Sequence, residues 1–183
     1  MLLPIKETAG VILDIRYASD NNFVGRAVYA RPVALLHREA HAAFVRALAR
    51  AQVLGLGFRI FDAFRPIEVQ SILWDAVSDK TFVADPALGG THPRGIALDL
   101  TLFDLATGED LPMGTGFDAV TPLSAHGALE GLSAEVIRNR ALLLGLMSAA
   151  GWDSYEPEWW HYNLPDGDAL PVLSAADVPE GPL

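Results

Sequence analysis

The sequence of 183 residues contains no cysteine. Disulfides, cysteine nucleophiles, iron–sulfur clusters and thiolate zinc sites are therefore excluded, and any tightly held metal must rest mainly on nitrogen and oxygen ligands. The lack of cysteine does not settle the cellular compartment, because disulfide-free proteins occur in every compartment. The candidate chemistry is thus limited to histidine, carboxylate, hydroxyl and guanidinium side chains.

Positive charge and long apolar runs are also scarce. The chain has 13 lysine and arginine residues against 23 aspartate and glutamate residues, a formal net charge of −10. Because the attraction to phosphate backbones and anionic lipid is missing, neither nucleic acid nor a membrane is expected as a partner. No apolar run reaches the ~20 residues of a membrane span, and the first ten residues lack the features of a signal peptide. We expect a cytoplasmic protein, and a periplasmic form with its signal removed would have the same sequence.

Length and composition, with 51% hydrophobic residues, predict that residues 1–183 form one domain around one core. Helices and strands alternate along the chain, which favours an α+β fold with a small central antiparallel sheet flanked by helices. The periodicity, helix caps and turn signals predict strands at 11–17, 58–63, 95–103 and 159–164, helices at 32–54, 66–78 and 133–150, a loop at 79–91 and a hairpin turn at 107–108.

The segment THPRGIALD, residues 91–99, combines a histidine with a strand that carries one carboxylate. Strand alternation places Asp99 on the same face as Gly95 and Ala97, whose small size leaves room for an ion or a substrate. His92 stands just before the strand and can lean over the same face. In the alternative interpretation, Asp99 caps a turn or pairs with an arginine, and His92 is a loop histidine.

The segment EPEWWHY, residues 156–162, sets Glu158 and His161 three residues apart among aromatic side chains that exclude water. Two nitrogen ligands and one oxygen ligand fill three tetrahedral positions of zinc and leave the fourth for a water, which a second carboxylate can deprotonate. In a regular strand the two side chains would point to opposite faces, so a turn or bulge at Glu158 is required if both serve one site. The alternative is an aromatic core strand with a surface glutamate.

A cation stands at the end of a predicted strand in DAFRP, residues 62–66. The guanidinium of Arg65 suits the stabilisation of a developing oxyanion. The alternative is a salt-bridged arginine at the boundary between a strand and a helix.

Three segments, DAFRP (62–66), THPRGIALDLT (91–101) and EWWHY (158–162), resemble the motifs of the D-alanyl-D-alanine dipeptidases, the VanX and DdpX family of LAS-type zinc peptidases. The segment DIRYASDNNFVGRAVY (14–29) is similar to the N-terminal signature of that family, and MGTGFD (113–118) is similar to a later loop. The resemblance spans most of the chain, and three motifs in the right order are far more specific than any one of them.

The resemblance implies one zinc ion on the predicted sheet, bound by His92, Asp99 and His161. It also implies that Glu158 is the general base and that Arg65 stabilises the transition state. The implied reaction is hydrolysis of D-alanyl-D-alanine, a small dipeptide, to two D-alanines. The rival functions are a D,D-carboxypeptidase acting on longer peptidoglycan stem peptides and a non-catalytic binder of zinc or cell-wall peptide. A glutamate placed to act as a base argues against the binder.

Further residues are implied to contact the substrate. Asp118 is expected near the substrate amino terminus, Tyr17 in the wall of the pocket, and Thr91 beside the substrate. The sequence departs from the family pattern at Gly90, where a hydroxyl residue is common, and at residues 119–122, where acidic residues are usual. These departures leave the metal chemistry untouched and bear on substrate preference.

Other patterns favour ordinary structural roles. In HREAH, residues 37–41, the glutamate is one place too late for a zinc helix, so a solvated helix face is expected. Ser124 and His126 lack the G-x-S-x-G elbow of serine hydrolases and indicate a polar loop. The run GLG at 55–57 lacks the third glycine and following helix of a nucleotide-binding loop, and predicts a helix stop before a strand.

Overall fold

The computed structural model describes the backbone of residues 1–183 and all side chains except that of residue 168. None of the described helices is both long and apolar enough to cross a membrane. The helices are α1 (Arg38–Val53), α2 (Ile67–Ala76) and α3 (Ala134–Ser148), and the strands are β1 (Leu2–Ile5), β2 (Val11–Leu13), β3 (Ala34–His37), β4 (Leu56–Asp62), β5 (Ala97–Asp104), β6 (Asp153–Ser154) and β7 (His161–Asn163).

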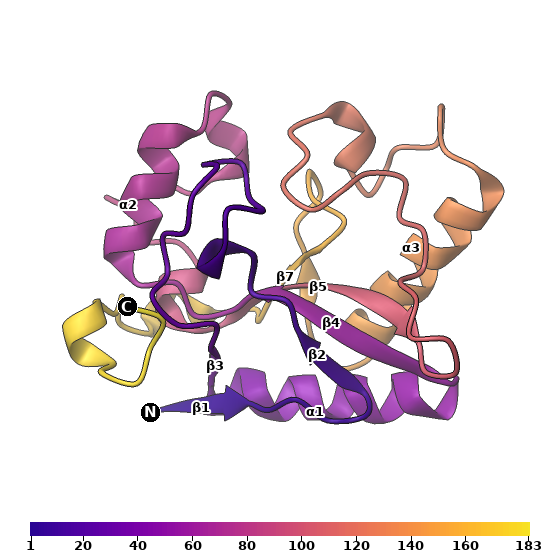
Figure 1. The fold of residues 1–183 in the computed structure, drawn as a ribbon, viewed down its shortest axis with the longest axis horizontal. Coiled ribbons are helices and arrows are strands. Elements are labelled where there is room, and N and C mark those ends of the chain that lie inside the picture. Colours follow the sequence, from indigo (N-terminus) through magenta and orange to yellow (C-terminus); the bar gives the residue numbers. More distant parts are fainter.

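The central sheet has five strands in the order β2-β4-β5-β7-β6, and β1 pairs with β3 in a separate ribbon (Figure 1). Every pair in the central sheet is antiparallel except β2 with β4, which is parallel. Parallel neighbours require a long crossover, and here the crossover contains β3 and α1. The predicted α+β class is therefore confirmed, with one parallel pair added to the expected antiparallel sheet.

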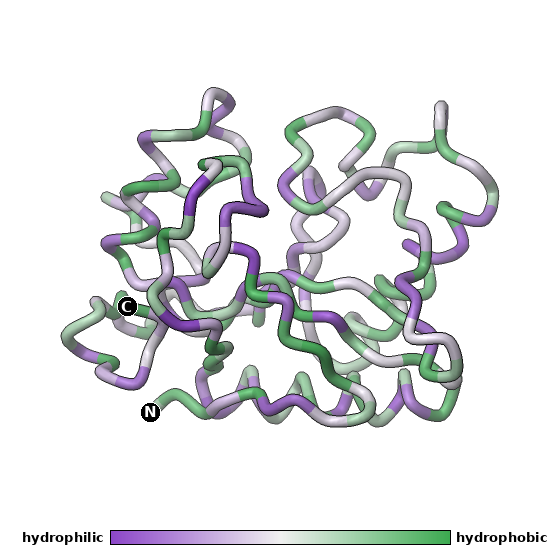
Figure 2. The backbone as a smooth tube through the Cα atoms, viewed as in Figure 1, coloured by the Kyte–Doolittle hydropathy of each residue, from purple (hydrophilic) through white to green (hydrophobic). Residues whose placement is uncertain are grey.

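Helix α1 covers one side of the central sheet (Figure 1). Its buried residues recur every three or four positions and are mostly alanine: Ala40, Ala43, Phe44, Ala47 and Ala51. These small side chains let the helix lie close to the strands, and its polar and apolar residues alternate along the tube in Figure 2. Because the apolar stripe of α1 is packed on the sheet, this side is core.

The predicted helix at 32–54 is wrong at its start. Residues 34–37 form strand β3 instead, which pairs with β1 in antiparallel register, Leu3 opposite Leu36. Residues 34–37 are not helical because their backbone hydrogen bonds go to a partner strand about 30 positions away. No local sequence signal predicts such a partner. The predicted strand at 11–17 also ends early, at Leu13, and the chain turns into a short 3₁₀ helix at Arg16–Ala18.

The remaining elements lie close to their predicted positions. Ser133 caps α3, where its hydroxyl accepts a hydrogen bond from the backbone N–H of Val136 at 3.2 Å. Gly151 follows that helix with φ +95°, a conformation that favours glycine. Gly108 also has a positive φ, at the turn where Phe103 and Asp110 form an antiparallel bridge.

Candidate metal centre

Three side chains that the sequence singled out as metal ligands meet at one point. His92, Asp99 and His161 each offer a ligand atom, and these atoms lie within 4.8 Å of one another. Nε2 of His92 is 3.2 Å from Nδ1 of His161 and 3.3 Å from Oδ2 of Asp99. Nδ1 of His161 is 3.0 Å from Oδ1 of Asp99. Two nitrogens and one oxygen thus converge as a tetrahedral ion with an open position requires.

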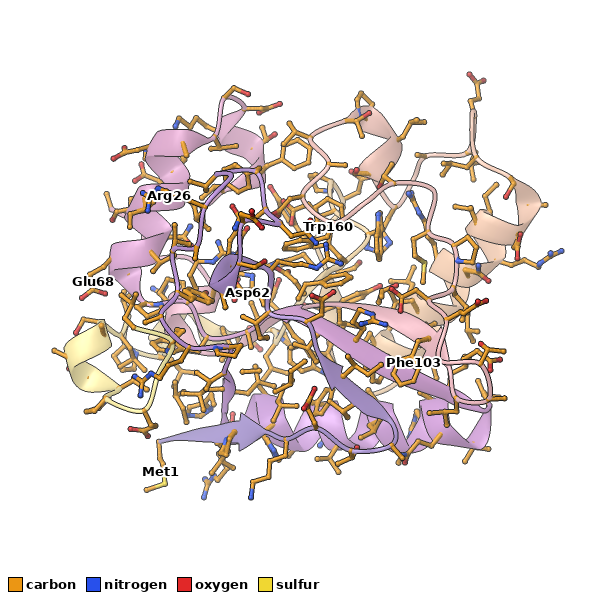
Figure 3. The ribbon with its side chains drawn as sticks, in the orientation of Figure 1. Met1, Arg26, Asp62, Glu68, Phe103 and Trp160 are labelled. Carbon is orange, nitrogen blue, oxygen red and sulfur yellow. The ribbon has the colours of Figure 1, made fainter. Side chains whose placement is uncertain are left out.

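The sheet register places two of these side chains and a third acidic residue in one row. Asp99 of β5 lies opposite His161 of β7 and opposite Asp62 of β4. A register shift between Ile60 and Asp62 inserts one extra residue in β4. Without this bulge Phe61 would face Asp99, so the bulge turns Asp62 onto the face of the candidate ligands. Asp62 and Trp160 lie near the middle of the molecule, and Phe103 lies at the distant end of β5 (Figure 3).

His92 reaches the row from a 3₁₀ helix, His92–Arg94, that precedes β5. Gly95 ends this helix with φ +68°, and a Cβ there would lie 2.6 Å from a methyl carbon of Leu2. Nδ1 of His92 lies 2.6 Å from the carbonyl oxygen of Ala63. Since a carbonyl only accepts, Nδ1 carries the proton, and Nε2 faces the candidate centre with its lone pair.

The protonation states suit a metal ion. Burial lowers the pKa of His161, so its imidazole is neutral at pH 7. Burial opposes ionisation of Asp99, but the neighbouring rings of His92 and His161 lower the pKa of its carboxyl well below the usual value. Neutral imidazoles and an ionised carboxylate are the forms that bind zinc. The residues present therefore fit the metal that the sequence predicts.

Glu158 enters the site from a turn, as the sequence required. Its backbone N–H donates to the carbonyl of Tyr155 at 3.1 Å, and the N–H of His161 donates to the carbonyl of Glu158 at 3.2 Å. This turn brings Oε2 of Glu158 to 3.9 Å from Nδ1 of His161. Burial raises the pKa of the Glu158 carboxyl well above its usual value, and the carboxylates of Asp99 and Asp118 raise it further. A buried carboxyl with a raised pKa is a candidate for a general base or acid.

Arg65 is held by two residues to which the sequence analysis gave no role. Its Nε and Nη2 are each 2.9 Å from Oδ2 of Asp62, and its Nη1 donates to Oε1 of Gln70 at 3.0 Å. Asp62 in turn accepts a hydrogen bond from the hydroxyl of Tyr29 at 2.8 Å. Burial alone would lower the pKa of Arg65, but Asp62 raises it well above the usual value, so the guanidinium stays charged. Nη2 of Arg65 also lies 3.7 Å from Oδ2 of Asp99, so the guanidinium borders the candidate metal centre.

The polar residues surround a cavity of about 410 Å³. All eight residues proposed from the sequence line it: Tyr17, Arg65, Thr91, His92, Asp99, Asp118, Glu158 and His161. Its wall also contains residues that the sequence analysis missed, among them Gln70, Trp74, Tyr155, Trp160 and Asn163. Of these, Tyr155 and Trp160 stand in or beside EWWHY, where the motif itself was the available signal. Gln70 and Trp74 lie on α2, where they read as ordinary helix residues.

Asp118 lines the same cavity in an unusual backbone conformation, with φ +60°. The hydroxyl of Tyr17 lies 3.0 and 3.2 Å from its two carboxyl oxygens. Burial, with a contribution from the nearby Asp99, raises the pKa of Asp118 to about 8. The ring of Tyr17 also packs under the guanidinium of Arg65, whose Cζ is 5.2 Å from the ring centre.

Gly90, the departure beside Thr91, has a structural reason. Its φ is +82°, a region that favours glycine, and a Cβ there would lie 3.0 Å from Cβ of Ala84. A hydroxyl residue at this position therefore requires a different path of the neighbouring loop. The absence of a hydroxyl side chain at position 90 therefore follows from the backbone conformation of the cavity wall.

The other histidine and serine patterns lie apart from the cavity. His41 lies on α1 and His37 at the end of β3, and neither lines the cavity. Ser124 is completely buried, with its hydroxyl donating to the carbonyl of Ala119 at 2.6 Å. His126 packs edge-on against the ring of Tyr162, 5.9 Å between ring centres.

Comparison with known proteins agrees with this geometry. The M15 peptidase family model, described as D-ala-D-ala dipeptidase, matches residues 3–176. The D-alanyl-D-alanine dipeptidase of Escherichia coli K12 is 38% identical over 162 residues, which cover 88% of this chain and 83% of that protein. Proteins of the same name from Streptomyces coelicolor and Enterococcus faecium are 35% and 32% identical, and the alignments cover 85% and 86% of this chain and 87% of each relative.

These matches run over nearly the whole chain and confirm the resemblance that the motifs carried. They also confirm the expectation of a peptidase. The chain belongs to the D-alanyl-D-alanine dipeptidase family of M15 peptidases.

Proposed function

We propose that the protein is a zinc-dependent dipeptidase that hydrolyses D-alanyl-D-alanine to two D-alanines. The observation that carries the proposal is the convergence of two imidazoles and one carboxylate beside the buried Glu158, on the wall of a cavity of about 410 Å³. The names of the relatives supply the substrate. We propose that residues 1–183 form a single zinc peptidase domain, because residues from positions 17 to 161 line the same cavity.

The proposed zinc ligands are Nε2 of His92, a carboxyl oxygen of Asp99 and Nδ1 of His161. When bound, the ion would supply Lewis-acid chemistry, polarising the scissile carbonyl and lowering the pKa of a water to about 7. The hydrogen bond from Nδ1 of His92 to the Ala63 carbonyl keeps the other ring nitrogen free for this role.

Glu158 is the proposed general base and acid. It takes a proton from the attacking water as the water oxygen bonds to the carbonyl carbon, and it gives that proton to the leaving nitrogen as the peptide bond breaks. Burial raises the pKa of its carboxyl, which makes the carboxylate a stronger base. Glu158 takes one proton and gives one proton back, so its carboxylate is ionised again at the end of the cycle.

Arg65 and Asp118 are the proposed partners of charge on the substrate. The guanidinium of Arg65, which lines the cavity, would donate to the negative oxygen that forms on the carbonyl carbon. Asp118 would bind the ammonium group of the dipeptide, because a buried carboxyl becomes favourably ionised when a cation faces it. Tyr17 orients Asp118 through its hydroxyl, and Thr91, next to His92, also lines the cavity.

The proposed partner is thus a small dipeptide with a free amino terminus. A cytoplasmic location remains a prediction from the sequence. The rival enzyme function, a D,D-carboxypeptidase, requires a cavity that accepts a blocked amino terminus, and a buried Asp118 disfavours one because acetylation would leave its carboxyl desolvated and unpaired. The non-catalytic binder is disfavoured by Glu158, whose carboxyl lies beside the proposed ligands.

The proposal is tested by comparing D-alanyl-D-alanine, its N-acetyl form and a peptidoglycan stem pentapeptide as substrates, with metal analysis of the purified protein. We expect one zinc per chain, cleavage of the free dipeptide and none of the other two substrates. Comparable cleavage of the N-acetyl dipeptide would replace the dipeptidase by the carboxypeptidase. Bound zinc with no cleavage of any of the three would support the binder.

A further inference from the structure

The conformation of Asp118 needs support from its surroundings. Its φ of +60° is uncommon for a residue with a side chain and costs free energy unless neighbouring contacts hold it. The residue belongs to a long connection between β5 and α3, of which residues 113–125, here called the Asp118 loop, form the cavity side. What fixes this loop therefore decides where the Asp118 carboxyl stands.

A series of hydrogen bonds holds the loop at Ala119, the residue after Asp118. The Ser124 hydroxyl donates to the carbonyl of Ala119 at 2.6 Å and lies 3.1 Å from Oγ1 of Thr115. Because the Ser124 proton is used on Ala119, Thr115 is the donor of the second bond. Thr115 in turn accepts from Nε1 of Trp159 at 2.8 Å. The order of donation is thus Trp159 to Thr115 to Ser124 to Ala119.

The same residues join the Asp118 loop to the turn that carries the proposed base. The backbone N–H of Trp159, the residue after Glu158, donates to the carbonyl of Ser124 at 2.9 Å. Ser124 thus binds the Asp118 side through its hydroxyl and the Glu158 side through its carbonyl. Its exposed fraction is zero, and it does not line the cavity, so it has no direct access to a substrate.

Arg140 of α3 fastens the ends of the same loop. Its Nε donates to the carbonyl of Met113 at 2.8 Å, and its Nη1 donates to the carbonyls of Leu123 and Ala125 at 2.9 and 3.1 Å. The ends of the loop are therefore held independently of Ser124. Loss of the Ser124 hydroxyl should loosen the middle of the loop, where Asp118 stands, and leave its ends in place.

We propose that Ser124 is a positioning residue that sets the Asp118 carboxyl for recognition of the substrate ammonium group. The inference rests on the role proposed above for Asp118. Ser124 acts through Asp118, so its removal should weaken the binding of substrates that carry the ammonium group. The chemical step, which depends on Glu158 and the metal ligands, should change little.

The test uses Ser124→Ala in the metal-loaded enzyme. We expect KM for D-alanyl-D-alanine to rise about 3- to 10-fold, the scale of one lost hydrogen bond, with kcat changed less than 3-fold. The matched control is Ser71→Ala, which removes a similar hydroxyl bond to the carbonyl of Ile67, 3.0 Å long, from a side chain outside the cavity. It should leave both constants unchanged. A loss confined to kcat would overturn the proposal.

The decisive measurement is the double variant with Asp118→Asn. If Ser124 acts through Asp118, Ser124→Ala raises KM in the wild-type background and has no further effect when Asp118→Asn is present. Equal increases in both backgrounds would overturn the inference. If Asp118→Asn alone leaves KM and the preference over the N-acetyl dipeptide unchanged, the role proposed for Asp118 itself fails.

A second variant covers poor folding of Ser124→Ala. Thr115→Val removes the hydroxyl between Trp159 and Ser124 but keeps the bond from Ser124 to Ala119. We expect a smaller KM increase in the same direction, again absent in the Asp118→Asn background. An increase that persists without Asp118 would contradict the proposed positioning.

Discussion

The two sides of the cavity are built in different ways. On the strand side, Asp99 and His161 line the cavity and stand in a row with Asp62 across three paired strands, and His92 joins them from the 3₁₀ helix before β5. On the loop side, Asp118 comes from the connection between β5 and α3. Backbone pairing fixes each strand residue, whereas a side-chain hydrogen bond from Tyr17 holds the Asp118 carboxyl.

This difference matches what each side is proposed to do. A metal needs ligand atoms placed to within a few tenths of an ångström. The paired strands supply such placement for Asp99 and His161, and the bond from Nδ1 to the Ala63 carbonyl supplies it for His92. Loops tolerate changes of length and sequence, and they adapt a fixed chemistry to a particular substrate. Substitutions on the strand side should therefore abolish activity, and those on the loop side should alter selectivity and stability.

The largest effect is expected at the strand side. His161→Ala removes one of three proposed ligands, so both metal and activity should fall to background levels. Metal analysis with a D-alanyl-D-alanine assay measures both. His41→Ala, which changes a histidine of α1 outside the cavity, should keep the metal and the activity. Full zinc occupancy in His161→Ala would remove this residue from the ligand set.

A second substitution separates metal binding from chemistry on the same side. Glu158→Gln should keep the metal and the fold and lose at least ~100-fold in kcat, because an amide cannot accept the proton. Rapid-mixing or steady-state assays on protein of verified metal content measure the loss. A variant with near-normal kcat would show that another group is the base.

Arg65 lies between the two sides, and its loss should be smaller. Arg65→Ala should raise the barrier by roughly 2 to 4 kcal/mol, seen in kcat more than in KM. Arg65→Lys should recover only part of the lost kcat, since an ammonium cannot keep the bonds to both Asp62 and Gln70 in the same geometry. A pure increase in KM would make Arg65 an anchor for the substrate carboxylate instead.

The last prediction concerns stability instead of activity and arises on the loop side. The pKa of Asp118 is about 8 in the folded protein against an ordinary 3.8. The folded state thus retains a proton that the unfolded state loses, and stability should decrease as the pH rises from about 4 to 8, by at most about 1.4 kcal/mol per pH unit. Denaturant unfolding of metal-free protein should show a shallower decrease for Asp118→Asn. Identical pH slopes for the two proteins would contradict the burial of an uncompensated carboxyl.

Local patterns could predict the residues of the site better than the contacts that hold them. Asp99, Glu158 and His161 stand in short segments whose composition already suits metal chemistry. In a regular strand Glu158 and His161 would point to opposite faces, and the turn that this required is present. The helix predicted from residue 32 was wrong because β3 depends on pairing with β1, a contact between distant segments. The alignment of Asp62 with Asp99 depends on a bulge in β4. Strand alternation without the bulge would place Phe61, not Asp62, opposite Asp99.

The support of the Asp118 loop was equally beyond local reasoning. Ser124 reads as a loop serine because its partners, Thr115 and Trp159, are up to 35 positions away along the chain. A hydrogen-bond chain of this kind becomes visible only when three segments are folded together. Residue types and spacing therefore predicted the chemistry, and the fold supplied the supporting contacts.

The pairing of Asp99 with His161 has a consequence for the folding equilibrium. These residues are 62 positions apart in a chain that has no cysteine. An ion held between them would bridge distant segments of the chain as a disulfide does in other proteins, except that the bridge forms only in the native state. Its contribution would grow with the free metal concentration as RT ln(1 + [M]/Kd), about 4 kcal/mol at a thousand times Kd. The stability of this protein would then follow the metal supply of its surroundings, and a chelator would act on it as a mild denaturant.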